Sequence, residues 1–250
     1  MQRRSLLALV CLVLLAPILE ALAAPLPEAK PEDVGLSSQR LERLGAMIQQ
    51  AVDSGEIPGA VMMVARKGKL VYQRAFGMQD AAQGVPMKTD AIFRIFSMTK
   101  PVVSVGAMML VEEGRLGLHE PISKYLPEFK EMQVAVEGFD PVTGVSTFST
   151  VPAKRPITVQ DLLRHTAGLT YGVFLPRHSA VGNLYREAKV FSAPSLEAFS
   201  RTIAKLPLRQ EPGTTWEYSH ASDILGRVIE VASGLPLDRF VAERILQPLK

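Results

Sequence analysis

A serine and a lysine three residues apart are the first side chains in this sequence that could do chemistry together. They begin and end the stretch Ser97-Met-Thr-Lys100, which has the spacing S-x-x-K. On a helix, residues three apart share a face, so the hydroxyl and the amine can come within hydrogen-bond reach. A neutral amine in that position could deprotonate the hydroxyl and make it a nucleophile. The pair therefore predicts nucleophilic serine chemistry.

The lysine can act as a base only if its pKa is lowered, because an ordinary lysine is protonated at pH 7. Ser97 and Lys100 lie where the apolar segment of residues 98–113 begins, which predicts a buried helix. Pro101 places the start of that helix close to Ser97. Burial and a helix N-terminus both disfavour a positive charge, so we expect a lowered Lys100 pKa. The alternative interpretation is a capping serine beside a solvated lysine.

A tyrosine lies in a second candidate segment, Pro212-Gly-Thr-Thr-Trp-Glu-Tyr218-Ser-His220. The pattern predicts a turn and an aromatic extended stretch just before a helix. The phenol of Tyr218 could relay a proton between Ser97 and a leaving group if a nearby ammonium lowers its pKa. The alternative is a core tyrosine whose hydroxyl is simply hydrogen-bonded.

Hydrophobic periodicity predicts helices and two hairpins around these segments. A helix over residues 39–52 should be capped by Ser37 or Ser38. Residues 59–65 and 70–76 should form a hairpin, whose first strand is apolar on both faces and therefore resembles a central strand. A small hairpin is expected within residues 131–156. The further helices are expected at residues 158–168, from Ser195 to before Pro207, at 221–232 and at 237–245.

Residues 1–23 have the composition of a secretory signal peptide: a basic start, a short apolar run and a small-x-small exit. We expect cleavage after Ala23, with Ala24 as the alternative, and one mature catalytic domain over residues 24–250. The apolar run is too short for a stable membrane anchor. The single cysteine, Cys11, lies inside this leader, so the mature chain should contain no disulfide. The expected location is the periplasm or the exterior of the cell.

Composition argues against several other classes of function. The 28 Lys and Arg residues are interspersed with 25 Asp and Glu residues, so there is no basic run that would indicate nucleic-acid binding. We expect no metal, because the histidines show no ligand spacing, and no other cofactor. Nothing in the sequence indicates an oligomeric state. The four histidines are His119, His165, His178 and His220.

Three segments together resemble the β-lactamase-related serine hydrolases, which include class C β-lactamases, D-alanyl-D-alanine carboxypeptidases and family VIII carboxylesterases. They are Ser97-Met-Thr-Lys100, Ile157-Thr-Val-Gln-Asp-Leu-Leu-Arg-His-Thr-Ala-Gly-Leu169, and the segment from Pro212 to Arg227. The resemblance extends from about Gly35 to Lys250. It implies an α+β fold of the β-lactamase/transpeptidase type, in which an antiparallel sheet is flanked by helices and accompanied by a mainly helical lobe.

The resemblance also implies a role for each of the three candidate residues. Ser97 would be the nucleophile, Lys100 the general base and Tyr218 a proton relay, forming an acyl-enzyme with a small ester or amide substrate. His165 would position a loop. His220 stands where the β-lactamases and peptidases of the family carry asparagine, and this favours esters over amides. His220 could also assist proton transfer.

Two alternative functions stay open. The first is a β-lactamase or D,D-carboxypeptidase, and the second is a non-catalytic binding relative. In the family, the third motif and the strand whose N–H completes the oxyanion hole come after the position of Lys250. If Lys250 is the true C-terminus, we expect an inactive or poorly folded chain without these sheet strands, since losing one oxyanion donor costs about 10²–10³ in rate.

Overall fold

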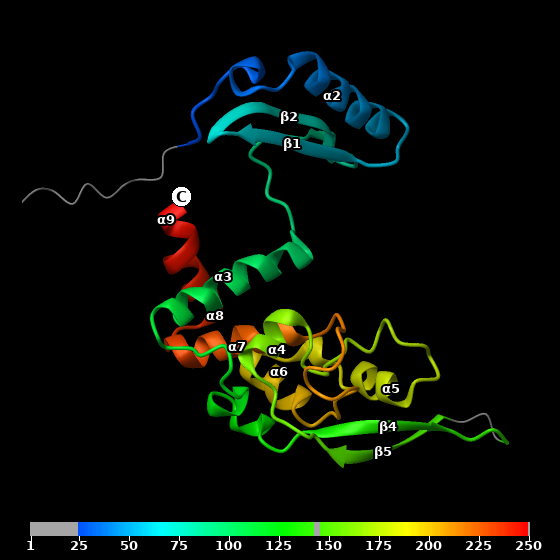
Figure 1. The fold of residues 1–250 in the computed structure, drawn as a ribbon. Helices are drawn as coiled ribbons and strands as arrows, with labels where there is room; N and C mark the ends of the chain where they lie inside the picture. Colours follow the sequence, from blue (N-terminus) through cyan, green and yellow to red (C-terminus); the bar gives the residue numbers. More distant parts are fainter. Residues whose placement is uncertain (1–24, 143–145, 250) are drawn as a thin grey trace, which may run out of the picture. The chain divides into compact units, whose positions relative to one another are not determined.

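The computed structural model describes residues 25–142 and 146–249 (Figure 1). The expected signal peptide over residues 1–23 lies outside the described residues. The chain divides into two compact units, Met1–Ile95 and Phe96–Lys250, and each is described by itself.

The first unit packs one long helix on a small antiparallel sheet. Its first described helical element is a short 3₁₀ turn, η1, and α2 follows after Ser37, whose hydroxyl accepts the backbone N–H of Arg40 at 3.3 Å. The expected helix and its cap are therefore confirmed. Among the described residues, the strand order in the sheet is β1-β2-β3. The elements are η1 (Pro31–Val34), α2 (Ser38–Asp53), β1 (Gly59–Arg66), β2 (Lys69–Asp80) and β3 (Val85–Pro86).

A small core joins α2 to β2. Leu41 of α2 is buried together with Tyr72 and Phe76 of β2. The hairpin expected for β1 and β2 is confirmed, and the two strands pair antiparallel. The expectation of a central first strand is wrong for the described residues, because β1 pairs with β2 alone and forms one edge of this sheet. Its Met63 side chain is also exposed.

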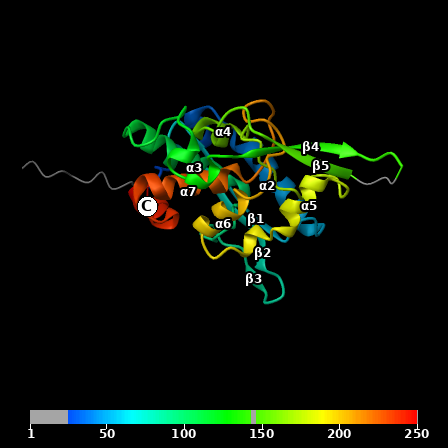
Figure 2. The same cartoon turned by 90° about the horizontal axis from the view of Figure 1, so that it is seen from below.

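The second unit is mainly helical, with one antiparallel hairpin. Its helical elements are η2 (Phe96–Met98), α3 (Thr99–Glu112), η3 (Ile122–Lys124), η4 (Pro127–Phe129), α4 (Val159–Arg164), α5 (Ala180–Glu187), η5 (Val190–Ser192), α6 (Leu196–Ile203), α7 (Ala221–Ser233), α8 (Leu237–Val241), η6 (Ala242–Leu246) and α9 (Gln247–Leu249). The hairpin consists of β4 (Gln133–Phe139) and β5 (Ser146–Pro152), which confirms the small hairpin expected there. Both views show it extending away from the helices, with α5 beside it (Figures 1 and 2).

Helix α7 is the centre of this unit. It contacts α3, α4, α6 and α8, and the elements gather around it in Figure 1. Its Ile224, Leu225 and Val228 side chains are almost completely buried. Because α7 begins three residues after Tyr218 and also packs against α3, it connects the two segments that carry the candidate residues.

Helix α3 is buried on one face only. Val103, Ala107 and Leu110 face the core, whereas Val105 and Met108 are 52% and 43% exposed. Within the second unit taken by itself, α3 is therefore covered on one face only, which differs from the expectation of burial all round. A helix turns through a full circle in 3.6 residues, so a partner on one side leaves the other side uncovered. A Cβ on Gly106 would lie 2.9 Å from the Phe240 ring, which shows how closely α8 approaches α3.

Two helices end differently from their expected bounds. Helix α4 ends at Arg164 rather than Gly168, because His165 adopts a left-handed conformation with φ 55° that cannot continue a helix. The last expected helix begins at Leu237 as α8 and passes into a wider turn, η6, from Ala242. None of the helices within residues 25–142 and 146–249 is both long and apolar enough to cross a bilayer.

Asp161 holds the start of α4 and the loop that precedes it. Its carboxylate accepts hydrogen bonds from the Thr158 backbone N–H and hydroxyl at 2.9 and 2.7 Å and from the Thr166 hydroxyl at 2.9 Å. Arg155 adds two more, at 2.8 and 2.9 Å. Burial alone would raise the pKa of Asp161, but Arg155 and the threonines outweigh that effect and lower it to about 2. The ionised form is therefore strongly favoured by the fold.

We expect the stability supplied by Asp161 to be lost in acid. Because the folded pKa lies below the unfolded value, the contribution is complete above about pH 4 and disappears as the pH falls towards 2; it should amount to about 2 kcal/mol. Urea unfolding of the wild type and of Asp161→Asn from pH 7 to pH 2 measures it. The difference between the two proteins should shrink across that window. A difference that stays constant down to pH 2 would contradict the assignment.

Candidate active site

Ser97 lies in a tight turn at the beginning of α3. The turn η2 leads directly into the helix, as expected from Pro101, and the Ser97 side chain is exposed. Phe96 has φ 44°, which a bulky residue adopts only at an energetic cost. Strain of this kind is concentrated at functional sites, where it fixes the direction of a neighbouring side chain.

The structure brings the three residues singled out in the sequence into one cluster. The Lys100 Nζ lies 3.2 Å from the Ser97 Oγ, and the Tyr218 hydroxyl lies 2.6 Å from the same oxygen. The Lys100 Nζ is also 4.5 Å from the centre of the Tyr218 ring. Both the ammonium and the phenol therefore converge on Ser97.

The direction of the Lys100 pKa is opposite to the expectation. Desolvation works to lower it, but the hydroxyls of Tyr218 and Tyr171 stabilise the ammonium and raise the Lys100 pKa above its ordinary value. The effect of partial burial on the Lys100 pKa is thus outweighed by two tyrosines that are distant in the sequence. The expectation of a neutral Lys100 is wrong, and the lysine is a cation in this arrangement.

The same contacts lower the pKa of Tyr218. Its interaction with Lys100 is the largest cause, and the hydrogen bond with Ser97 is the next. A phenol with a lowered pKa is a better proton acceptor near neutral pH than an ordinary tyrosine hydroxyl. The sequence analysis required an ammonium near Tyr218 for proton relay, and Lys100 lies in that position.

His165 holds the segment that carries Tyr218. Its backbone carbonyl accepts the Glu217 N–H at 2.8 Å, and its Nδ1 accepts the Ser219 N–H at 3.3 Å. Its ring centre lies 5.0 Å from that of Tyr218. Desolvation, followed by the charge of Lys100, lowers the His165 pKa, so the ring stays neutral and can accept. These contacts fit the expected positioning of a loop by His165.

The same loop is held one turn earlier. The Gly213 N–H donates to the Thr166 carbonyl at 2.6 Å, and the Arg209 N–H donates to the Gly168 carbonyl at 2.8 Å. Gly213 has φ +83°, and a Cβ there would collide with the Arg155 guanidinium. Glycine is therefore required at this turn, and the turn directs the chain towards Tyr218.

Tyr171 is a neighbour of the cluster that the sequence analysis did not single out. Its ring centre lies 5.9 Å from the Lys100 Nζ and 5.5 Å from the Tyr218 ring centre. Burial is the main cause of its raised pKa, so Tyr171 stays a neutral phenol beside the ammonium. The sequence did contain a signal that could have identified Tyr171, because it comes two residues after Leu169, the end of the second segment that resembles the family.

His220 is buried and does not point at Ser97 through any described contact. Its Nδ1 lies 3.2 Å from the Asp223 carboxylate, and its ring meets the Tyr171 ring edge-on at 4.3 Å between centres. Its exposed fraction is 1%. These contacts place His220 behind Tyr171, where it packs against the cluster.

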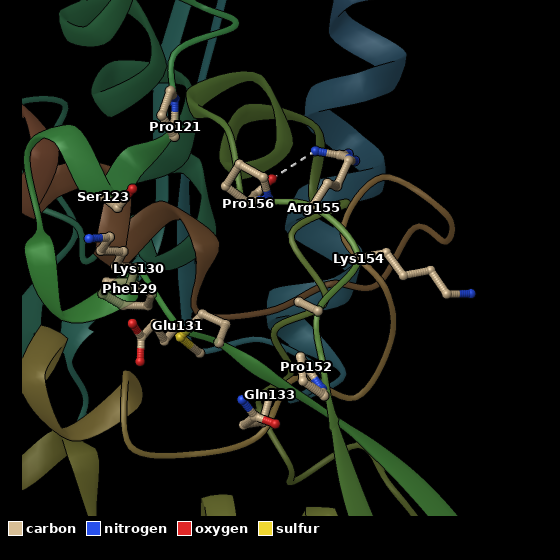
Figure 3. Close-up of a pocket in the computed structure, with 12 residues that line it drawn as sticks. Pro121, Ser123, Phe129, Lys130, Glu131, Gln133, Pro152, Lys154, Arg155 and Pro156 are labelled. Carbon is tan, nitrogen blue, oxygen red and sulfur yellow. Dashed lines mark hydrogen bonds between the residues drawn. The ribbon is translucent and has the colours of Figure 1, made fainter.

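Aromatic side chains line one side of the cluster. A cavity of about 510 Å³ is bordered by Phe174, Trp216 and Tyr218. A second cavity, of about 580 Å³, lies at the base of the β4–β5 hairpin (Figure 3). None of the candidate residues lines this second cavity, and Figure 3 shows Lys154 pointing away from it. The aromatic cavity is the relevant one, because Tyr218 belongs both to its wall and to the cluster.

Across residues 25–142 and 146–249, His, Cys, Asp and Glu side chains do not gather in groups of three that could hold an ion.

Known proteins resemble this chain both in sequence and in structure. The Beta-lactamase family profile matches residues 44–250. Esterase EstB from Burkholderia gladioli is 35% identical over 212 residues, which cover 83% of this chain and 49% of EstB. The solved structure of EstCE1, a hydrolase with promiscuous acyltransferase activity, aligns with a TM-score of 0.69 and 33% identity over 83% of this chain and 51% of EstCE1.

A second solved structure, unliganded simvastatin synthase (LovD) from Aspergillus terreus, aligns with a TM-score of 0.67 and 31% identity over 84% of this chain and 52% of LovD. The chain thus spans about half the length of the relatives it matches. The α+β fold of the β-lactamase/transpeptidase type is confirmed by these neighbours. A family match that runs from residue 44 to residue 250, more than half of the sequence, shows that the chain belongs to the beta-lactamase family.

Proposed function

We propose that this protein is a serine hydrolase that cleaves small carboxylic esters through an acyl-enzyme on Ser97. The observation that carries the proposal is the convergence of Lys100 and Tyr218 on the Ser97 hydroxyl, at 3.2 and 2.6 Å. Family membership supports it, since members of the beta-lactamase family are serine hydrolases. The chain spans about half the length of the relatives it matches, so the activity of the whole protein is part of this proposal.

The charges favour Tyr218 as the proton acceptor and Lys100 as its electrostatic partner. Tyr218 in its ionised form takes the Ser97 proton while Ser97 Oγ bonds to the substrate carbonyl carbon. The Lys100 ammonium stabilises the phenolate before this step. Tyr218 then gives the proton to the departing alcohol oxygen as the ester C–O bond breaks. Water then attacks the acyl carbon while Tyr218 accepts its proton, and Tyr218 returns this proton to Ser97 Oγ as the bond from Oγ to the acyl carbon breaks and the acid is released.

The start of α3 supports charge development at the reacting carbonyl. Ser97 lies directly before the first turn of a 14-residue helix, where unpaired N–H groups carry partial positive charge. An oxyanion formed on the substrate is stabilised by such donors. The strained Phe96 backbone helps to fix Ser97 against this helix end.

Esters are favoured over amides because this chain has His220 at the position where the β-lactamases and peptidases of the family carry an asparagine carboxamide. The His220 side chain is buried against Tyr171 and Asp223, so it offers no exposed donor and acceptor pair to a substrate amide. Cleavage of a β-lactam or a cell-wall peptide is the rival outcome of the same experiment.

We also propose that the protein is exported. The composition of residues 1–23, with Arg3 and Arg4 before a short apolar run and Ala21-Leu-Ala23 at its end, supports a cleavable leader. The absence of cysteine after Cys11 is compatible with an oxidising compartment.

Replacing Ser97 by alanine should abolish ester hydrolysis. We expect kcat/KM on p-nitrophenyl butyrate to fall by at least about 10³-fold, because the nucleophile is lost. Ser149→Ala, which changes an exposed serine on β5, is the matched control and should behave like the wild type. A fluorophosphonate should label Ser97 in the wild type and in the control. Hydrolysis of nitrocefin without ester hydrolysis would select the β-lactamase alternative, and no labelling would select a binding protein.

The pH dependence of acylation should follow Tyr218. We expect the first-turnover rate to rise with pH along a limb below the ordinary tyrosine value of 10.0, since Lys100 lowers the Tyr218 pKa. Lys100→Met should move the limb to higher pH and slow acylation at neutral pH by about 10²-fold. Lys100→Arg retains the charge and should leave the limb nearer its original position. Lys130→Met, at an exposed lysine near the β4–β5 hairpin, is the control.

A neutral Lys100 acting as the base would need a lowered pKa, and the limb would then depend on Lys100 itself. In that case Lys100→Met would abolish acylation at every pH instead of moving the limb, and Lys100→Arg would not restore it. That result would show that the described ionisation order is wrong, even if Ser97 is the nucleophile.

Export should leave a mature protein that begins at Ala24. Expression with the native N-terminus, followed by fractionation and intact mass spectrometry, should show loss of residues 1–23 from the exported form. Replacing Ala21 and Ala23 with bulky residues should block processing. A cytoplasmic protein that retains Met1 would contradict the proposal.

A further inference from the structure

We propose that the aromatic cavity beside Tyr218 binds the alcohol half of the ester and selects alcohols that carry a flat, uncharged apolar group. The inference rests on the proposed function and names its substrate class. The cavity has a volume of about 510 Å³ and is bordered by Phe174, Trp216 and Tyr218. The cavity is widely open to solvent, and its volume is large enough for a small organic group to lie against these rings.

Tyr218 connects this cavity to the nucleophile. Its ring forms part of the cavity wall, while its hydroxyl lies 2.6 Å from the Ser97 Oγ. A group that fills the cavity is therefore separated from the reacting centre by the length of one phenol ring. Tyr218 therefore both contacts a bound group and acts on the bond that is cleaved.

The path of the proton decides which half of the ester enters the cavity. In acylation the bond from Ser97 Oγ to the carbonyl carbon forms, and the bond from that carbon to the alcohol oxygen breaks. The proton that Tyr218 took from Ser97 must pass to this alcohol oxygen. The leaving oxygen therefore faces the Tyr218 hydroxyl, and the rest of the alcohol extends along the Tyr218 ring into the cavity.

The orientation of the aromatic rings favours a flat group. The Trp216 and Tyr218 rings lie nearly parallel, with an angle of 18° and 6.3 Å between centres. The Phe174 ring is inclined by 37° to Tyr218 at 6.5 Å. Trp216 and Phe174 are 65% and 72% exposed, which leaves their faces open to a ligand. Aromatic rings prefer offset-stacked or edge contacts with other rings at such separations.

The polar residues of the cavity favour an uncharged group. Arg209 forms an ion pair with Glu217 at 2.8 Å, and the Gln210 amide donates to the same carboxylate at 3.2 Å. The positive and negative charges are thus already paired with each other. A charged alcohol would find no unpaired partner here and would lose its hydration.

Binding can be measured without turnover, because Trp216 is the single tryptophan of the sequence. In the Ser97→Ala background, p-nitrobenzyl alcohol should quench Trp216 fluorescence with saturation, and Phe174→Ala should weaken binding several-fold. Trp216→Phe provides the background signal. Quenching that stays linear with concentration, as it does for a free tryptophan derivative, would overturn the proposal.

Kinetics then assign the cavity to one half of the ester. We expect Trp216→Ala to lower the preference for benzyl butyrate over ethyl butyrate by about tenfold, which corresponds to about 1.4 kcal/mol. The preference for ethyl 4-phenylbutyrate over ethyl butyrate should change much less. Phe148→Ala, at an exposed aromatic residue of β5, is the matched control and should change neither ratio.

The other outcomes are informative in different ways. A shift in the acyl preference instead of the alcohol preference would assign the cavity to the acyl half and overturn the proposal. Unchanged ratios would show that the cavity takes no part in selection. If the wild type hydrolyses no ester, the proposed function fails, whereas saturable quenching of Trp216 would still show that the cavity binds flat alcohols.

Discussion

The hydrogen bond between the Tyr218 hydroxyl and the Ser97 Oγ is the interaction on which the account of this protein depends. The two residues are 121 positions apart in sequence, yet their oxygens lie 2.6 Å apart. Lys100 interacts with both, so that the ammonium, the phenol and the serine share one small network. The charge of Lys100 makes Tyr218 the better proton acceptor, and removing any member changes the protonation of the other two.

Such a contact between distant segments requires a rigid support. Helix α7 supplies it on one side, since it packs against α3 and follows directly after the Tyr218 segment. On the other side, the backbone carbonyls of His165 and Thr166 accept hydrogen bonds from the Glu217 and Gly213 N–H groups. Asp161 in turn holds Thr166 through its hydroxyl and has a pKa of about 2 in this setting. The site is therefore built on elements whose own hydrogen bonds are satisfied.

Local spacing and caps could be predicted from the sequence because their causes are local. The S-x-x-K spacing, the Ser37 cap and the Thr158 capping box depend on neighbouring residues alone. The direction of the Lys100 pKa could not be predicted, because Tyr171 and Tyr218 approach it only in the folded chain. The apolar sequence of α3 likewise showed that the helix avoids water, but it did not show that only one face would be covered within the described residues. Helix α4 ends early because His165 adopts a left-handed backbone conformation, which could not be predicted from the residue type.

The ionisation of Tyr218 is the most direct test of this account. The sequence contains five tyrosines, and their ring carbons can be followed by NMR after specific isotope labelling, with Tyr218→Phe identifying the signal. The account predicts that Tyr218 titrates below 10.0, whereas Tyr125, Tyr171 and Tyr185 titrate above it, and that Lys100→Met moves the Tyr218 titration towards 10.0. A Tyr218 signal that titrates at or above 10.0 in the wild type would contradict the central claim.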